Sequence, residues 1–327
     1  MKKIRLAAFL ALSITACTPK DNATAETAGE RWYFTFSTEE LTVRSAPENS
    51  ITGSVGISAY ISDTEDISGR PEYMWNEEVV RSGAGWNTLN SFQKPEVGRH
   101  LRFQAYYPYA PQTGTPAIRL SDSSVSGPMS LEYEVPSDVA GQIDLMTGES
   151  PVLSTDAENK DVPVTMYHRL SAIRFVTGDI GLAGTIRSIS LINVHKKGAY
   201  RIGDDGWSLD SGTDGVFSVY PDYVVEGVTL AEAPDGRQEV AGGDNTFIML
   251  PQPIPDEARL QIRYEAEIDG VTDIHVLETK LKSRNIQEWQ WGKIYTYQIS
   301  VVSLALEYET FVHDWEPGVQ ADVDIII

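Results

Sequence analysis

Short stretches in which apolar and polar residues alternate dominate this chain of 327 residues. Representative stretches lie at 32–36, 55–61, 101–106, 186–194, 260–264 and 295–301. Period-two alternation rich in aromatic and β-branched residues is the pattern of β-strands with one buried face. Turn residues such as Asp269-Gly270 separate the stretches and indicate hairpins. Because no amphipathic segment of four helical turns occurs, we expect an all-β protein built of β-sandwiches.

The N-terminus has the pattern of an exported protein. A basic start is followed by an uncharged run at 6–14 and by small residues directly before Cys17, the single cysteine. This run is well short of the ~20 residues that a membrane-spanning helix needs, so residues 1–16 are predicted to be a signal peptide. The segment 14–17 resembles a lipobox, in which Cys17 is acylated and becomes the new N-terminus. The alternative is an ordinary secretory signal beside an incidental cysteine.

Composition divides the rest of the chain. Residues 17–30 are small and polar, which is typical of a flexible tether. The remaining length exceeds what one hydrophobic core usually serves, so we expect two domains. A polar stretch at 154–162 precedes a new hydrophobic pattern, which places the domains at 31–162 and 163–327. No second cysteine is available, so packing alone must stabilise both.

Charge restricts the partners. The chain carries 47 acidic and 26 basic residues, a formal net charge of −21. Such a surface repels phosphate backbones, which argues against nucleic acid as a partner. It also disfavours electrostatic adhesion to anionic lipids. We therefore expect an acidic ectodomain that a lipid on Cys17 holds at the membrane.

The sequence patterns of catalysis are absent. Five histidines are scattered without the spacing of metal ligands, and neither a G-x-S-x-G elbow nor a Gly-rich phosphate loop occurs. We expect no catalytic residues, no cofactor and no metal site.

Two groups of residues leave a binding interpretation open. The acidic segment Asp204–Asp214 half resembles a calcium loop, but Pro221 stands where the closing glutamate belongs. A solvated hairpin end is therefore favoured over weak calcium binding. The aromatic runs at 106–109 and 289–291 would stack on sugar rings in a lectin, although packing in a core is the commoner role of such side chains.

Several segments, taken in chain order, resemble the fimbrillin family of surface lipoproteins from Bacteroidetes. These segments are 103–109, with its aromatic-proline corner, and then 144–148, 164–175, 250–253 and 291–297. Each is weak alone. Their order and spacing over nearly the whole mature chain make the resemblance specific.

The resemblance implies two tandem β-sandwich domains with transthyretin-like topology behind the signal peptide and tether. It also implies export as a lipoprotein, display on the outer membrane and assembly with other fimbrial subunits. In polymerising members, a trypsin-like protease cuts after an arginine behind the first strand, and a strand from a neighbouring subunit fills the vacated groove. The physical basis is β-augmentation, in which an unpaired sheet edge takes its backbone hydrogen bonds from another chain.

In this sequence the resemblance points to Arg44 as the cleavage site, directly after a first strand at 32–43. Arg31 is a competitor, but cutting there would release only the tether. The alternative is that Arg44 is an ordinary loop arginine in an uncut tip, anchor or stand-alone lipoprotein.

If the chain polymerises, the strand at 32–43 is expected at a sheet edge. Its alternate residues Tyr33, Thr35, Leu41 and Val43 are expected to plug an apolar groove. The closed groove would keep the precursor monomeric.

The C-terminal stretch 319–327 alternates and then ends apolar. Its residues Val323, Ile325 and Ile327 are expected to form either the donor strand or the last strand of the second sandwich. The chain stops soon after the turn at 315–318, which weakens the donor interpretation without removing it.

We therefore expect a structural or adhesive subunit of a fimbria on the outer membrane, without catalysis. The alternative is a non-polymerising surface lipoprotein that binds a host or bacterial glycan or protein through the same fold. The expected core anchors are Phe36, Tyr60, Phe103, Tyr106, Phe175, Leu191, Ile262 and Tyr297.

Replacing the single cysteine tests the lipoprotein prediction. Cys17→Ala should block acyl transfer and lipoprotein-type processing, because the thiol is the acylated group. The expected result is loss of palmitate labelling, with the protein mislocalised or retained as precursor. Labelling equal to that of the wild type would contradict the prediction.

Overall fold

The computed structural model describes residues 30–38, 51–66, 68–83, 85–156, 161–227, 238–302 and 304–315. The predicted all-β fold is confirmed: the helical elements among these residues are two 3-10 turns, η1 (Val139–Gly141) and η2 (Gly243–Asn245). None of the described helices has the length and apolar character needed to cross a membrane. Cys17, Arg44 and the C-terminal residues Val323, Ile325 and Ile327 lie outside the described ranges.

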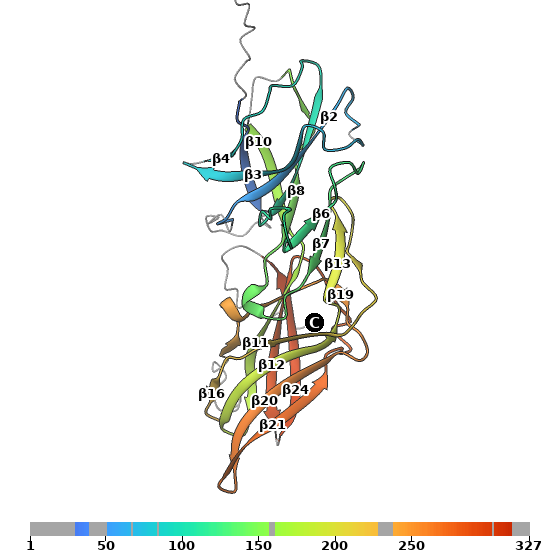
Figure 1. Ribbon diagram of the computed structural model, residues 1–327. Helices are drawn as coiled ribbons and strands as arrows, with labels where there is room; N and C mark the ends of the chain where they lie inside the picture. Colours follow the sequence, from blue (N-terminus) through green and yellow to red (C-terminus); the bar gives the residue numbers. More distant parts are fainter. Residues whose placement is uncertain are drawn as a thin grey trace, which may run out of the picture.

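The strands of the N-terminal half pair into a closed ring (Figure 1). Their order is β2-β3-β4-β1-β10-β8-β5; β5 pairs back with β2, and β9 pairs with the first two residues of β5. The members are β1 (Tyr33–Thr38), β2 (Val55–Ser62), β3 (Met74–Ser82), β4 (Gly85–Thr88), β5 (His100–Tyr107), β8 (Met146–Glu149), β9 (Leu153–Ser154) and β10 (Asp161–His168). A sheet that closes on itself has no free edge along its circuit.

Two five-stranded sheets form the C-terminal half. The first contains β11 (Ser171–Ile180), β17 (Glu239–Ala241), β18 (Phe247–Met249), β23 (Lys293–Val302) and β24 (Ala305–Asp314). The second contains β12 (Gly184–Val194), β15 (Gly215–Val219), β16 (Tyr223–Val225), β20 (Arg259–Ile268) and β21 (Val271–Lys280). Alternate residues of both sheets bury into one shared hydrophobic cluster, so the two sheets form a β-sandwich.

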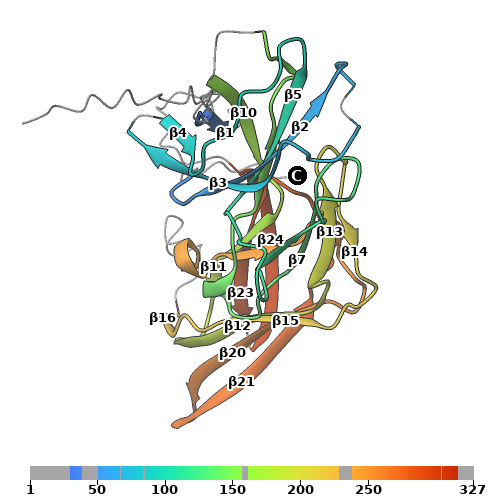
Figure 2. The same cartoon turned by 45° about the horizontal axis from the view of Figure 1, so that its top comes forward.

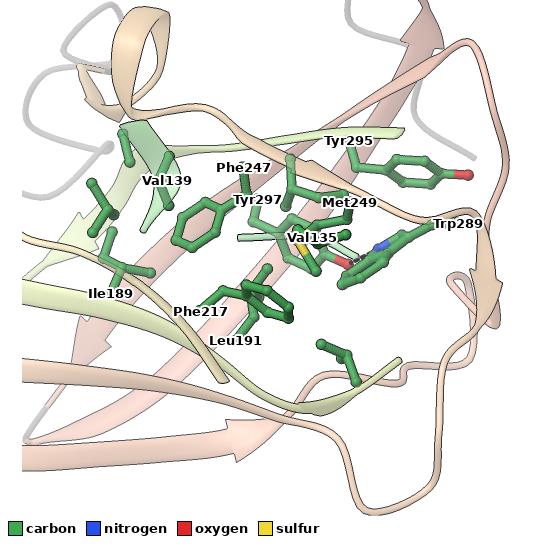
Figure 3. Packing of buried hydrophobic residues seen from close by; sticks show 14 of the residues in the cluster. Val135, Val139, Ile189, Leu191, Phe217, Phe247, Met249, Trp289, Tyr295 and Tyr297 are labelled. Atoms are coloured by element: carbon green, nitrogen blue, oxygen red, sulfur yellow. Dashed lines mark hydrogen bonds between the residues drawn. The ribbon is translucent and has the colours of Figure 1, made fainter. Parts of the chain in front are cut away.

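The core of this sandwich includes an internal hydrogen bond. Trp289 and Tyr297 are both fully buried, and the indole Nε1 of Trp289 donates to the hydroxyl of Tyr297 at 3.0 Å (Figure 3). The ring of Phe175 packs against Tyr297 with their centroids 5.5 Å apart. Burying these large rings is favourable because the polar tips of Trp289 and Tyr297 satisfy each other.

A small sheet connects the halves (Figure 2). It consists of β6 (Ile118–Leu120), β7 (Ser130–Glu134), β13 (Lys197–Arg201) and β14 (Ser208–Leu209). A separate two-stranded sheet is formed by β19 (Gln252–Pro253) and β22 (Glu288–Trp289). Strand β7 pairs antiparallel with β13 over its whole length. Its residues Leu131 and Tyr133 therefore join the same hydrophobic cluster as Phe175 of the C-terminal half.

Strand β10 runs across the predicted division between residues 162 and 163. This strand pairs with β1 and β8 of the ring, and its alternate residues Val162, Val164 and Met166 pack in the N-terminal cluster. Strand β11 then pairs in the C-terminal sandwich. The pairing partners thus change after His168, a few residues beyond the predicted division.

The predicted core anchors are confirmed as buried. Their exposures do not exceed 4%; the residues are Phe36, Tyr60, Phe103, Tyr106, Phe175, Leu191, Ile262 and Tyr297. The predicted hairpin at Asp269-Gly270 is also confirmed: it joins β20 to β21, with φ of 51° and 79° at its two central residues. Two positive φ values are what a tight hairpin turn of this type requires.

Alkaline pH should destabilise the fold through buried tyrosines. Burial raises the pKa of Tyr133 from its usual value of 10.0 to about 12. The unfolded chain loses this proton at a lower pH than the folded chain, so the stability is complete below about pH 10 and is lost as the pH rises to about 12. Between about pH 9 and about pH 12, the wild type should therefore lose ~2 kcal/mol more of its unfolding free energy than the Tyr133→Phe variant, which lacks this hydroxyl. Urea unfolding at each pH measures it, and identical pH profiles for variant and wild type would contradict it.

Candidate functional site

Strand β1 is one member of the N-terminal ring and stands between β4 and β10 in the strand order. It runs parallel to β10 from Tyr33↔Asp161 to Thr38↔Met166. It also pairs antiparallel with β4 at two positions. The prediction of an edge strand is therefore wrong for the start of β1, because β4, which follows β3 through a hairpin, pairs with Tyr33 and Phe34. Among the described residues, Thr35–Thr38 pair with β10 alone.

The core-facing residues of β1 are Phe34 and Phe36. Their side chains are 1% and 4% exposed, whereas Tyr33 is 54% exposed and Thr35 is also exposed. The prediction that Tyr33 and Thr35 plug the groove is therefore wrong. Successive side chains of a strand point to opposite faces, so a choice of register that is off by one residue selects the solvent face. Leu41 and Val43 of the predicted set lie outside the described residues.

Aromatic contacts fix the inner face of β1. The ring of Phe34 meets Phe103 of β5 edge to face at 5.3 Å, and Phe36 meets Trp86 of β4 in the same manner at 5.4 Å. The two phenylalanines lie 5.9 Å apart with nearly parallel rings. Each buried aromatic side chain contributes roughly 1.5–3 kcal/mol relative to an exposed one. Strand β1 is therefore a strong part of the N-terminal core.

Hydrogen bonds hold the start and the outer face of β1. The backbone N–H of Trp32 donates to Thr88 Oγ1 at 3.2 Å, and the N–H of Thr88 donates to the Trp32 carbonyl at 3.1 Å. The indole of Trp32 donates to the hydroxyl of Tyr73 at 2.9 Å. On the solvent side, Thr35 Oγ1 donates to the carboxylate of Asp161 at 2.9 Å. The strand thus combines an apolar inner face with a polar outer rim.

This arrangement defines a strand-binding slot beneath β1, bounded by β4 and β10. If β1 left, β10 would lose its pairing with residues 33–38, and Phe103 and Trp86 would lose their partner rings. A slot with unpaired backbone groups on its walls and aromatic side chains on its floor binds an extended chain that carries apolar residues two positions apart.

Sequence analysis did not identify β10 as the partner of β1. The alternation of Val162, Val164 and Met166 is visible in the sequence and is the signal that was available. The pairing itself joins residues such as Tyr33 and Asp161, which are 128 positions apart (161 − 33). A parallel contact at that distance leaves no local pattern in a single sequence.

The acidic segment Asp204–Asp214 has the contacts of a solvated hairpin. Asp204 pairs with Arg201 at 2.9 Å and Asp214 with Lys196 at 3.2 Å. The hydrogen bond from Lys196 lowers the pKa of Asp214. Within the described ranges, no three His, Cys, Asp or Glu residues are grouped so as to hold a metal ion.

The aromatic runs divide between core and surface. Tyr106 and Trp289 are buried and hydrogen-bonded inside the protein, so neither is a platform for a sugar. Trp291 is only half-buried, with the guanidinium of Arg169 at 4.6 Å from its ring centroid.

Comparison with known proteins places the chain among surface appendage proteins. The family model described as fimbrillin-like matches residues 44–315. The fold is similar to that of a fimbrial protein from Bacteroides vulgatus ATCC 8482, with 17% identity, a TM-score of 0.67 and coverage of 88% of this chain and 99% of that one. Two proposed cell adhesion proteins also share the fold. The one from Bacteroides ovatus ATCC 8483 has 13% identity, a TM-score of 0.57 and coverage of 88% and 98%. The one from Bacteroides uniformis ATCC 8492 has 17% identity, a TM-score of 0.52 and coverage of 88% of this chain and 99% of that one. Comparison with curated protein sequences gives no match.

Substitutions on the two faces of β1 test which face it buries. Phe34→Ala should lower the free energy of unfolding by ~3–5 kcal/mol, because it leaves a cavity beside Phe103. Tyr33→Ala, one residue earlier, is the matched control and should change it by only ~0.5 kcal/mol. Both values come from urea unfolding. Equal destabilisation by the two variants would contradict the facing of β1.

Proposed function

Because this chain belongs to the fimbrillin-like family, we propose that it is a structural or adhesive subunit of a cell-surface fimbria. We propose further that it is exported as a lipoprotein and assembles by exchange of strand β1. The observation that carries the assembly proposal is the closed ring, in which one short terminal strand fills a slot floored by aromatic side chains. The family is structural and not enzymatic.

Acylation of Cys17 accounts for how an acidic chain stays at a membrane. The signal pattern supplies export, and the small polar residues of the tether separate the lipid from the fold. Two acyl chains or more are needed for stable anchoring, which a modified N-terminal cysteine provides. We place the protein on the outer membrane, facing outward.

Cleavage at Arg44 would break the covalent link between β1 and the rest of the ring, but β1 would stay in its place. After the cut, β1 is still held by its pairing with β10 and by the burial of Phe34 and Phe36. It therefore leaves only as another strand replaces these contacts step by step. Removing the covalent link lets the displaced segment, which carries the acylated Cys17, separate from the ring.

The C-terminal stretch has the spacing that the slot requires. Val323, Ile325 and Ile327 are two positions apart, as are Phe34 and Phe36. An incoming strand with this spacing presents its apolar residues to the floor of the slot while its backbone pairs with β4 and β10. The proposed partners are therefore other fimbrial subunits, joined by strand complementation.

Two variants test cleavage and donation separately. Arg44→Ala should leave a lipidated monomer after trypsin treatment, because β1 stays covalently attached. Deletion of 323–327 should permit cleavage but stop growth, because no donor strand is present. Oligomer ladders on gels run under mild denaturation and filaments in electron micrographs are the measurements.

Arg31→Ala is the matched control for the first variant and should polymerise like the wild type. A deletion variant that still forms filaments would show that another segment is the donor. A wild type that is never cut at Arg44 on cells would indicate a tip, an anchor or a lone surface lipoprotein.

A further inference from the structure

A cavity of about 610 Å³ lies below the ring, where several distant segments of the chain meet. The end of β10, the turn before β14, the pair β19 and β22, the start of β23 and the end of β24 contribute to its wall. Its volume falls within the roughly 300–1,000 Å³ that is usual for small-molecule sites. This cavity is separate from the strand-binding slot beneath β1.

Three half-buried tryptophans, Trp207, Trp291 and Trp315, line the cavity. Trp315 stacks on His168 with their centroids 4.4 Å apart and their planes 10° apart. The indole of Trp207 donates to the carbonyl of Arg169 at 2.8 Å, and the guanidinium of Arg169 lies over Trp291. The aromatic walls are therefore fixed in orientation before any ligand arrives, which lowers the entropic cost of binding.

His168 is a buried polar side chain at this cavity that keeps one atom unused. It is 8% exposed, and its Nδ1 lies 2.7 Å from Asp144 Oδ1. Its Nε2 is buried and has no hydrogen-bond partner among the described residues. A buried ring nitrogen without a partner is unfavourable, so the site suits a ligand that supplies a hydroxyl, which can donate or accept a hydrogen bond.

The charges of the wall disfavour an anionic ligand. Lys293 pairs with Asp314, and Arg169 is engaged by aromatic rings and by Thr147 Oγ1 at 2.7 Å. The remaining carboxylates at the wall, Asp205 and Glu288, would repel a carboxylate or a phosphate. The ligand that fits is uncharged, carries hydroxyl groups and has an apolar face.

We propose that this cavity binds a neutral saccharide. The C–H face of a pyranose ring stacks on the indole wall, and one hydroxyl forms a hydrogen bond with Nε2 of His168. This inference rests on the proposed function only in that an adhesive surface subunit meets glycans, and it is independent of strand exchange. The test therefore uses the uncleaved Arg44→Ala chain, so that a failure of assembly and a failure of saccharide binding remain distinguishable.

Isothermal titration of this chain with free glucose, galactose, mannose, N-acetylglucosamine and lactose is the test. At least one sugar should bind saturably with one site per chain. Trp291→Ala should weaken that binding by about tenfold or more, because a stacking surface is lost. Trp75→Ala, which removes an exposed tryptophan outside the cavity, is the matched control and should bind like the parent.

His168→Phe separates the hydrogen bond from the packing. Phenylalanine keeps a ring beneath Trp315 but removes Nε2 and also the Nδ1 contact with Asp144. Binding should weaken by about fivefold or more; the lost contact with Asp144 should also lower the unfolding midpoint, so binding is measured well below that midpoint. This variant also serves if Trp291→Ala does not fold.

Two results would overturn the proposal. The first is that none of the neutral sugars binds, or that binding survives in both Trp291→Ala and His168→Phe. The second is that sugar binds only after residues 316–327 are deleted. The segment begins next to Trp315, and such a result would make the chain's own C-terminal segment the occupant of the cavity.

Discussion

The parallel pairing of β1 with β10 is the contact on which the N-terminal half depends. It joins residues such as Tyr33 and Asp161, which are 128 positions apart (161 − 33), and completes the circuit of strands. Without it, β4 and β10 would each present an unpaired edge, and the rings of Phe103 and Trp86 would face water. Closure thus buries these rings and leaves no free sheet edge along the circuit of paired strands.

Tyr106 links the ring to the larger core. Its ring lies where a side chain on Gly56 would be, since a Cβ there would come within 2.0 Å of it. Its hydroxyl donates to Asn76 Oδ1 at 2.6 Å and accepts from the N–H of Ala110 at 3.0 Å. Together with the pairing of β7 and β13, this packing makes the halves continuous, without a polar linker between two independent cores.

Strand β10 connects the two surfaces that bear on function. Its first six residues pair with β1 and form a wall of the strand-binding slot, while Tyr167 and His168 at its end line the tryptophan-walled cavity. In the two proposals, main-chain hydrogen bonds serve assembly, whereas fixed aromatic and imidazole groups serve ligand binding. One strand, β10, contributes to both places.

The sequence by itself determined the all-β class, the hairpin at Asp269-Gly270 and the buried anchors such as Phe103 and Tyr297, because alternation and turn chemistry are local signals. The order of segments across the chain also carried the family resemblance. Only the tertiary structure decided that Phe34 and Phe36 face the core and that β1 lies between two strands. It alone placed the change of partners after His168 and gathered Trp207, Trp291 and Trp315 around one cavity. These features depend on pairing and packing between residues far apart in the chain, and such contacts leave no periodic trace in a single sequence.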